Sequence, residues 1–221
     1  SCAFFVMTEN AQLGFVAMSQ VGEHGSKWIP PGSIHTPIRQ DMVLLDKGRT
    51  NAAAAAISNT NIGAVENSRV RGNLDQTTLV GGAVATNAAA AGFADTDIGV
   101  VRDSAVGGNA TQNTTVLGAV NTNAGAVGMA DTRIGAVEGS DISGNLNQET
   151  TVVGAVQTNA GVGLASTSIG TVDNSDVSGS LNQGTFVGGG VATNAGLGAA
   201  QTSIGAVKDS SVRGTLNQTT T

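Results

Sequence analysis

The 221-residue sequence has few of the side chains that build an ordinary globular core. It contains no Tyr, one Trp and five Phe, and only 12% of its residues are charged, whereas 32 residues are Gly. Most of its apolar residues are Ala and Val. Small side chains suit close, regular stacking of the backbone better than an irregular core of large residues. The composition therefore favours a stacked, repetitive architecture.

The lack of basic runs, of long apolar runs and of a second cysteine argues against several classes of function. The net charge of −6 and the lack of a basic run argue against binding to nucleic acid or to an anionic membrane through charge. No apolar run reaches the roughly 18 residues that a membrane-spanning segment needs. A single cysteine, Cys2, excludes a disulfide within the chain.

The sequence also lacks the common catalytic motifs. It has no G-x-S-x-G elbow, no HExxH, no P-loop and no CxxC pair. Both histidines, His24 and His35, lie in the non-repetitive N-terminal part without metal-ligand spacing. We therefore expect no enzymatic activity, no cofactor and no metal site.

What the sequence does contain is an internal repeat. A Thr-Asn pair begins at residues 50, 86, 122, 158 and 193, and an Ile-Gly pair begins at residues 62, 98, 134, 169 and 204. The spacings are 36 or 35 residues throughout, which is typical of a solenoid. From Thr-Asn to the next Ile the distance shortens from 12 to 11 residues in the last two copies. Because deletions are tolerated in turns, the Ala/Gly stretch between these markers is expected to contain a turn.

Within each repeat, every second residue is fixed. In residues 140–156 the fixed positions read Ser, Ile, Gly, Leu, Gln, Thr, Val, Gly, Val, and nearly the same ladder recurs in the other copies. A period of two indicates a strand with two distinct faces. The positions between them drift and accept either charge, so we expect the fixed face to pack against its own copies and the drifting face to meet water.

The predicted fold is an all-β solenoid of five 36-residue repeats. Ile134-Gly135-Ala136-Val137 resembles Val153-Gly154-Ala155-Val156, so each repeat is expected to form two stacked strand–turn–strand layers, or about ten layers and about 50 Å in all. Residues 1–41 hold all three prolines and the only Trp, and are expected to form an N-terminal cap or arm. The repeat domain is expected to span residues 42–221.

Columns of like residues are expected to run along such a stack. A buried Gln is costly unless its amide is paired, and stacked amides can bond to one another as in cross-β structures. The predicted ladder residues are Gln76, Gln112, Gln148, Gln183 and Gln218; Asn51, Asn87, Asn123, Asn159 and Asn194; and Ile62, Ile98, Ile134, Ile169 and Ile204. For the Asn series, a left-handed turn conformation is an equal alternative. One carboxylate per repeat also recurs on the variable side, where a charged, soluble face is expected: Glu66, Asp103, Glu138, Asp173 and Asp209.

The two ends of the repeat region are complementary. Met42-Val43-Leu44-Leu45 aligns with the segment that would follow Thr219-Thr220-Thr221 in a further copy. An open stack exposes a bare edge at each end. These residues are therefore predicted to form a head-to-tail contact between copies of the chain, a heterologous contact that propagates into a filament. The alternative is a monomer in which residues 1–41 fold back over one end.

The repeats resemble secreted bacterial amyloid-type fibre subunits, the curli and Fap families. The resemblance lies in regularly spaced Gln and Asn within Gly/Ser/Thr/Val arches, as in SxVxGxLNQxT, and covers about residues 42–221. It implies secretion, extracellular self-assembly and a role in biofilm matrix or attachment, with copies of the same chain as partner.

Three other functions stay open. The IGxxxxS pattern from Ile134 to Ser140 is similar to the β-roll head of a trimeric adhesin, which predicts a trimer without a filament. A β-helical enzyme acting on polysaccharide would need aromatic platforms, and the repeats offer only Phe93 and Phe186. An ice-binding solenoid would need a flat Thr array on every layer.

Overall fold

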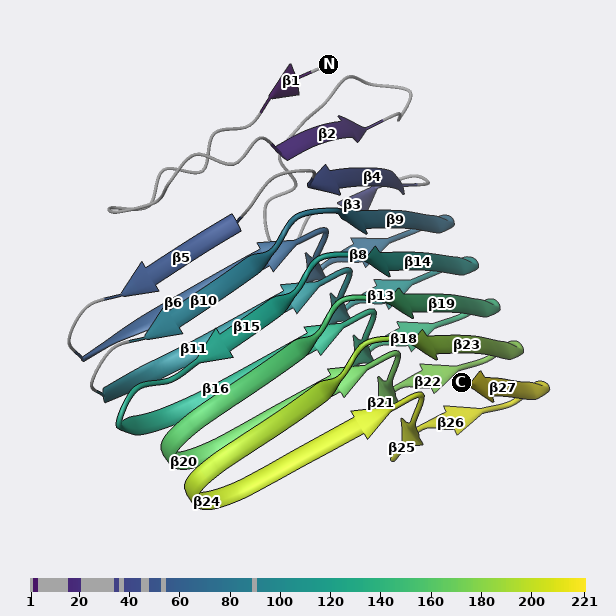
Figure 1. Cartoon of the computed structure of the whole chain (residues 1–221). Coiled ribbons are helices and arrows are strands. Elements are labelled where there is room, and N and C mark those ends of the chain that lie inside the picture. Colours follow the sequence, from purple (N-terminus) through teal and green to yellow (C-terminus); the bar gives the residue numbers. More distant parts are fainter. Residues whose placement is uncertain are drawn as a thin grey trace.

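The computed structural model describes residues 2–3, 16–20, 34–35, 38–44, 48–52, 55–88 and 91–221, with side chains described at 41–42, 58–88 and 91–221. Over these residues the secondary structure is entirely β, and the strands stack into a solenoid (Figure 1). The described ends of the chain lie at opposite ends of the stack. The predicted fold class, an all-β solenoid with a repeat of about 36 residues, is confirmed.

The strands form four ladders along the solenoid axis. Sheet A contains β1 (Cys2–Ala3), β2 (Val16–Gln20), β4 (Ile38–Leu44), β9 (Leu74–Val80), β14 (Ala110–Val116), β19 (Leu146–Val152), β23 (Leu181–Val187) and β27 (Leu216–Thr220). Sheet B contains β3 (Ile34–His35), β8 (Arg69–Val70), β13 (Ala105–Val106), β18 (Asp141–Ile142), β22 (Asp176–Val177) and β26 (Ser211–Val212). Sheet C contains β5 (Gly48–Ala52), β6 (Ala55–Ile62), β10 (Val84–Ala88), β11 (Ala91–Ile98), β15 (Val120–Asn123), β16 (Val127–Ile134), β20 (Val156–Ile169) and β24 (Val191–Ile204). Sheet D contains β7 (Val65–Glu66), β12 (Val101–Arg102), β17 (Val137–Glu138), β21 (Val172–Asp173) and β25 (Val207–Lys208).

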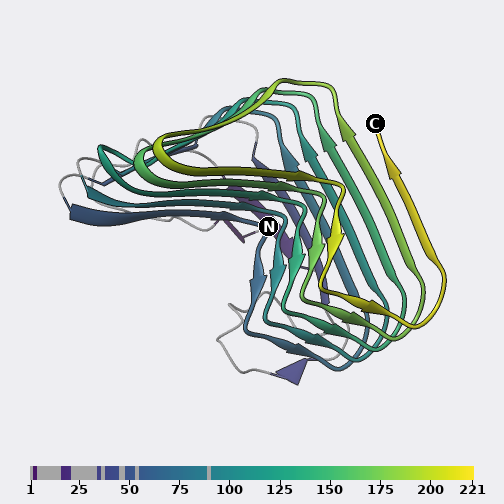
Figure 2. The same ribbon diagram turned by 90° about the horizontal axis from the view of Figure 1, so that it is seen from below.

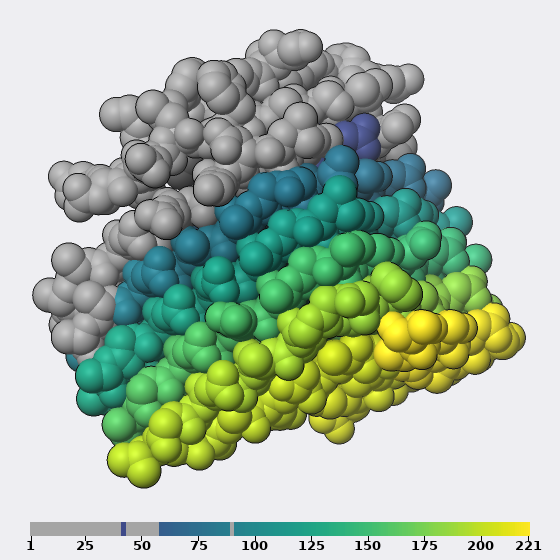
Figure 3. Space-filling model, in the orientation of Figure 1, coloured from purple at the N-terminus to yellow at the C-terminus, as the bar shows by residue number. Residues whose placement is uncertain are grey.

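Each repeat makes one coil, not two layers. The backbone neighbour of Gln112 is Gln148, 36 residues on, and the neighbour of Ile134 is Ile169. The coils follow the same bent outline one above another (Figure 2), and their surfaces form parallel ridges (Figure 3). At about 4.8 Å per layer, five coils are about 24 Å long, so the predicted ten layers and 50 Å were wrong.

The internal echo that suggested two layers has another origin. Ile134, Val152 and Val156 belong to one buried cluster, so the two similar segments are walls of a shared core. Similar Gly-bounded apolar segments are needed on both walls because both face the same interior. The similarity between the two segments of one repeat therefore arises because they face each other across the core, and not because they stack in successive layers.

The interior consists of three apolar compartments separated by polar ladders. In the middle coils the compartments are formed by three sets of residues: Val137, Ile142 and Leu146; Ile134, Val152 and Val156; and Ala130, Ala160 and Ala165. Along β19 buried and exposed residues alternate from Leu146 to Thr150, so the fixed face is inside, as predicted. The alanine compartment lies in the long arm, the projection formed by the strands of sheet C (Figure 2).

The Ile-Gly pair is explained by packing. Gly135 has φ +57°, and a Cβ added to it would overlap Thr150 Oγ1 and lie 3.0 Å from Thr150 Cβ. Other residues rarely adopt this backbone conformation, and none fits this space. The same relation recurs for Gly99 and Thr114.

The turn that absorbs the one-residue deletion lies at the tip of the arm. Three residues separate Asn123 from Val127, whereas two separate the equivalent Asn159 from Val162. The expectation of a turn in the Ala/Gly stretch is therefore confirmed. At the N-terminal side, parallel pairing with the next coil already begins at Ile34, eight residues before the expected boundary of the repeat domain, and it resumes at Ile38.

Candidate functional site

The last coil presents an open end. Among the described strands, β24, β25, β26 and β27 each pair on one side only, with β20, β21, β22 and β23. Thr219 and Thr220 lie in β27, and Thr221 N donates to Thr185 O of the preceding coil at 2.9 Å. The C-terminal half of the predicted subunit contact therefore lies at an unpaired edge. Such an edge is a template for another strand.

The direction of the main-chain groups at this end follows from the coil before it. Val156 N donates to Gly190 O, Val172 N to Ala206 O and Leu181 N to Thr215 O, at 2.8–2.9 Å, each toward the following coil. The equivalent residues of the last coil are Val191, Val207 and Leu216. Their N–H groups therefore point out of the stack, ready for a further layer of the same kind.

At the opposite end the predicted contact is already occupied in part. Strand β2 pairs antiparallel with β4, placing Met18 beside Met42, Ala17 beside Val43 and Val16 beside Leu44, while β9 takes the other edge of β4. Met42–Leu44 is thus not an open edge, and Leu45 lies outside the described residues. The antiparallel β2 caps sheet A, which agrees with a capping role for part of residues 1–41.

Other strands at this end have only one described partner. Strands β5, β6 and β7 pair with β10, β11 and β12 and with no other described strand. Val65 N donates to Val100 O at 2.8 Å, so the carbonyl at this position points toward the N-terminal end, and Ala64 is its equivalent one coil earlier. The two ends therefore offer complementary groups in sheets C and D and not in sheet A.

The asparagine ladder exists and reaches the open end. Asn123 Nδ2 donates to Asn87 Oδ1 at 2.8 Å, Asn159 Nδ2 to Asn123 Oδ1 at 2.8 Å, and Asn194 Nδ2 to Asn159 Oδ1 at 3.0 Å. None of these four residues has a positive φ, so the ladder and not the left-handed alternative is correct. Asn51 occupies the next position of the column by its backbone pairing. The Oδ1 atom of Asn194 is the next acceptor in the series.

The glutamines stack as predicted but bond differently. Gln76, Gln112, Gln148 and Gln183 are buried and in register. Each donates from Nε2 to the carbonyl of the glycine 13 residues earlier: Gly63, Gly99, Gly135 and Gly170. Among the described glutamines, the one amide–amide bond joins Gln148 Nε2 to Gln112 Oε1 at 3.3 Å. The column therefore ties sheet A to the glycine bend, and Gln218 ends it, exposed, in the last coil.

The isoleucines also stack as predicted. Ile62, Ile98, Ile134 and Ile169 are at most 5% exposed, and Ile204 of the last coil is half-buried. Their direct backbone pairing, Ile on Ile, gives the core a continuous apolar column. This column ends uncovered at the open end.

A chain of hydrogen-bonded threonine side chains, which the sequence did not reveal, runs through the long arm. Nine hydroxyl groups alternate between its two walls with Oγ1–Oγ1 distances of 2.7–2.8 Å: Thr60, Thr86, Thr96, Thr122, Thr132, Thr158, Thr167, Thr193 and Thr202. A hydroxyl is both donor and acceptor, so each can serve two neighbours. The sequence did show the Thr-Asn threonines and a threonine two residues before each isoleucine. It did not show that these two series face each other.

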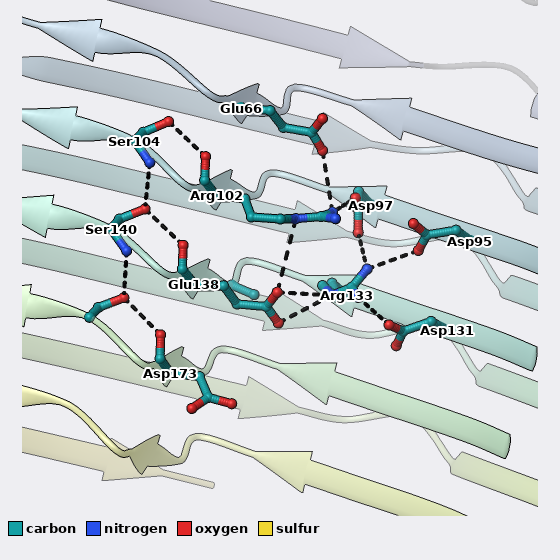
Figure 4. Close-up of polar contacts among 12 residues, drawn as sticks. Glu66, Asp95, Asp97, Arg102, Ser104, Asp131, Arg133, Glu138, Ser140 and Asp173 are labelled. Carbon is teal, nitrogen blue, oxygen red and sulfur yellow. Dashed lines mark hydrogen bonds and ion pairs between the residues drawn. The ribbon is translucent and has the colours of Figure 1, made fainter.

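A charged cluster lies where β11 and β16 meet β12 and β17 (Figure 4). Arg133 Nη1 lies 2.9 Å from Asp95 Oδ1 and 3.1 Å from Asp97 Oδ1, and its Nε lies 3.1 Å from Glu138 Oε2. Arg102 pairs with the fully buried Asp97 and lies 3.3 Å from Glu66, and Arg133 also pairs with Asp131. Five carboxylates thus surround two guanidinium groups.

Burial dominates the ionisation of this cluster. It raises the pKa values of Asp95, Asp97, Asp131 and Glu138, although the arginines oppose the shift. For Arg133, burial alone would lower the pKa, but the surrounding carboxylates outweigh it and the pKa lies above its ordinary value. A carboxylate whose pKa is raised by folding stabilises the fold below its ordinary pKa, and this contribution is lost as pH rises through the raised value. The cluster therefore favours the folded state more at pH 4 than at pH 7.

The column of one carboxylate per repeat requires a correction. Backbone pairing puts Glu66, Arg102, Glu138, Asp173 and Lys208 in one column, which therefore mixes three acids with two bases. Asp103 and Asp209 belong to the next position, with φ of 49° and 45°, where Asn67, Gly139 and Asn174 also adopt positive φ. Asp, Asn and Gly tolerate this conformation best. Their recurrence reflects a turn.

Within the described part of the chain, no group of His, Cys, Asp and Glu side chains has the arrangement of a metal site. His24 lies outside the described residues. No helix of sufficient length and apolarity to cross a bilayer is present in the same part of the chain.

Some known proteins resemble part of the chain. A molybdate-binding protein ModA of Azotobacter vinelandii is 53% identical over 58 residues, which is 24% of this chain and 23% of that protein. A molybdate-binding protein ModA of Rhodobacter capsulatus is 52% identical over 54 residues, 24% of this chain and 21% of that protein. The chain thus spans less than a quarter of the length of these relatives. No family model and no solved structure matches the chain, so the similarity is local.

Proposed function

We propose that the chain is a structural subunit that assembles end to end by continuing its β stack, as an extracellular, amyloid-like fibre for biofilm matrix or surface attachment. The observation that carries this proposal is the open last coil. Its N–H groups at Val191 and Val207 have no described partner and repeat, in position and direction, the N–H groups of Val156 and Val172, which bond to the following coil.

The N-terminal end supplies matching partners in this arrangement. The N–H of Val207 meets the carbonyl of Ala64 in a neighbouring copy, and β24 extends β5 and β6, so that Thr193-Asn194 continues onto Thr50-Asn51. The contact is heterologous, which means that it leaves a free copy of each surface and propagates. This version moves the predicted contact from Met42–Leu45 to β5–β7, since β2 covers β4.

The interior supports a structural role. Asparagine and threonine ladders run along the axis, and each gains one hydrogen-bonded step when a further coil is added. In-register stacking of identical side chains is the arrangement that stabilises cross-β fibres. The extracellular location rests on the resemblance to curli and Fap repeats, and surface labelling of intact cells tests it.

The assembly is tested with edge variants. Val191→Pro and Val207→Pro together remove two outward N–H groups that have no described partner in the chain, and Val191→Thr with Val207→Thr changes the same side chains while keeping both N–H groups. Sedimentation velocity at rising concentration should show growing rods for the unmodified chain and for the Thr control, and single chains for the Pro variant. A single-chain species at every concentration for the unmodified protein, or equal assembly of all three, would refute the proposal.

The alternative is a trimeric β-roll adhesin head. It predicts a trimer whose mass does not grow with concentration, so the same sedimentation experiment separates it from a filament. Binding of molybdate, the ligand named for the two similar proteins, is not part of the proposal. Their match is short, and the described charged cluster holds five carboxylates against two arginines, which disfavours an oxyanion.

A further inference from the structure

A hollow of about 490 Å³ opens on the outer face of sheet A and extends onto β27 of the last coil. Its centre is Gly184 in β23. Glu149 and Thr219 flank this glycine on the neighbouring strands, and Asn182 and Phe186 flank it along its own strand. Residues two apart on a strand share a face, so these four side chains frame one missing side chain.

The hollow arises because three residues in β23 and the turn after it differ from the residues at the same positions in other coils. At the position of Gly184 the other coils carry Thr77, Asn113, Glu149 and Thr219. Phe186 stands where neighbouring coils have threonine, and Gly188 follows where the two preceding coils have Leu117 and Val153. A Cβ on Gly188 would lie 3.1 Å from Phe186 Cε1, so this second glycine makes room for the ring. Gly188 thus makes room for the Phe186 ring, and Gly184 leaves the space beside that ring empty.

The polar wall of the hollow is held in place by its own ladder. Asn182 Nδ2 donates to Asn147 Oδ1 at 2.9 Å, and Asn217 Nδ2 donates to Asn182 Oδ1 at 2.9 Å. A carboxamide has two N–H groups, so Asn182 and Asn217 each keep one that this ladder does not use. Glu149 lies across Gly184 from Thr219, is exposed and forms no ion pair with a described side chain, which leaves its oxygens as strong acceptors.

We infer that this hollow binds one ring of a neutral saccharide. The exposed ring of Phe186 offers its electron-rich face to the C–H groups of a sugar, Glu149 accepts hydrogen bonds from hydroxyls, and the asparagine ladder donates to them. The volume falls within the range of small-molecule pockets, and the ladder limits the ordering that binding requires. The inference concerns binding alone: the hollow frames one carboxylate, and hydrolysis of a glycosidic bond ordinarily needs two.

The structure offers a variant that fills the hollow without disturbing the fold. A Cβ on Gly184 meets no atom within 4 Å, and its φ is not in the positive range, so Gly184→Thr restores the residue found in other coils. Gly190→Thr is the matched control, because Gly190 is also open and lies outside the hollow. Phe186→Thr likewise restores a residue of the neighbouring coils and removes the platform.

Binding is measured by saturation-transfer NMR with cellotriose, mannotriose and N,N′,N″-triacetylchitotriose, using the non-assembling Val191→Pro/Val207→Pro variant as well as the unmodified chain. At least one trisaccharide should bind both with a dissociation constant of about 1 mM or tighter. Gly184→Thr and Phe186→Thr should weaken it at least tenfold, with Gly190→Thr unchanged and assembly unaffected by any of the three. No saturation transfer from any trisaccharide, or equal binding by Gly184→Thr, overturns the inference. Transfer only to an amine probe, N-α-acetyl-lysine methyl ester, overturns it in favour of a cation site.

Discussion

Replacement of Gly135 by alanine is the sharpest perturbation of the fold that the structure offers. A non-glycine residue at φ +57° costs about 1–2 kcal/mol. The added Cβ also overlaps the Thr150 side chain, and overpacking of this kind costs about 1–3 kcal/mol. We therefore expect Gly135→Ala to destabilise the protein by about 2–5 kcal/mol. Gly190→Ala, where no atom lies within 4 Å, should change stability by less than about 1 kcal/mol.

The assay is urea unfolding followed by circular dichroism. With a slope of about 2 kcal/mol per molar urea, the loss corresponds to a midpoint lowered by about 1–2.5 M. Because repeat proteins can unfold coil by coil, hydrogen exchange of the coil that contains Thr150 should show the same loss locally. Combining Gly135→Ala with Thr150→Ala removes the overlap with Oγ1 and Cγ2 of Thr150 and should recover part of the steric loss, leaving the backbone part. A midpoint for Gly135→Ala within about 0.3 M of that for Gly190→Ala would refute the packing argument.

Further predictions concern the ladders and the charged cluster. Thr132→Val removes a buried hydroxyl between Thr122 and Thr158 and should cost about 1–3 kcal/mol by urea unfolding, whereas Thr132→Ser should cost less; equal losses would contradict a bonded hydroxyl chain. Asn123→Ala breaks two ladder bonds and should cost about 1–3 kcal/mol, and a loss below about 0.3 kcal/mol would show that the ladder does not stabilise the coil. Because burial raises the pKa values of Asp95 and Asp131, the melting temperature should gain more between pH 7 and pH 4 in the unmodified chain than in Asp95→Asn/Asp131→Ser; identical gains in calorimetry would contradict the pKa directions.

The sequence was sufficient to predict the solenoid architecture, because the residues that stack in columns recur in it at a constant spacing. The alternation around Gln148 and the spacing of Ile134 and Ile169 identify a strand face and its period without any knowledge of the turns. The one-residue deletion also located the tip of the arm. The number of layers per repeat was not accessible in this way, because facing walls of one core, such as those of Ile134 and Val156, need similar residues just as stacked layers do.

The features that the sequence did not reveal depend on which strands face or flank one another. Thr122 and Thr132 meet because two walls of the arm lie close together, and Arg133 meets Asp97 because backbone pairing places residues 36 apart in contact. The hollow at Gly184 likewise needs three aligned strands to be seen. These contacts follow from the register between neighbouring coils and from the way the walls of one coil face each other. The repeat length alone does not determine which side chains meet.

Cryo-electron microscopy of the concentrated 221-residue chain tests the central claim most directly. The account predicts rods with one 36-residue coil per layer of about 4.8 Å, in which the N–H of Val207 joins the Ala64 carbonyl of the next chain across an unbroken stack. Particles of a single size, or rods whose repeats of 36 residues advance by two layers or meet through sheet A at Met42, would contradict it.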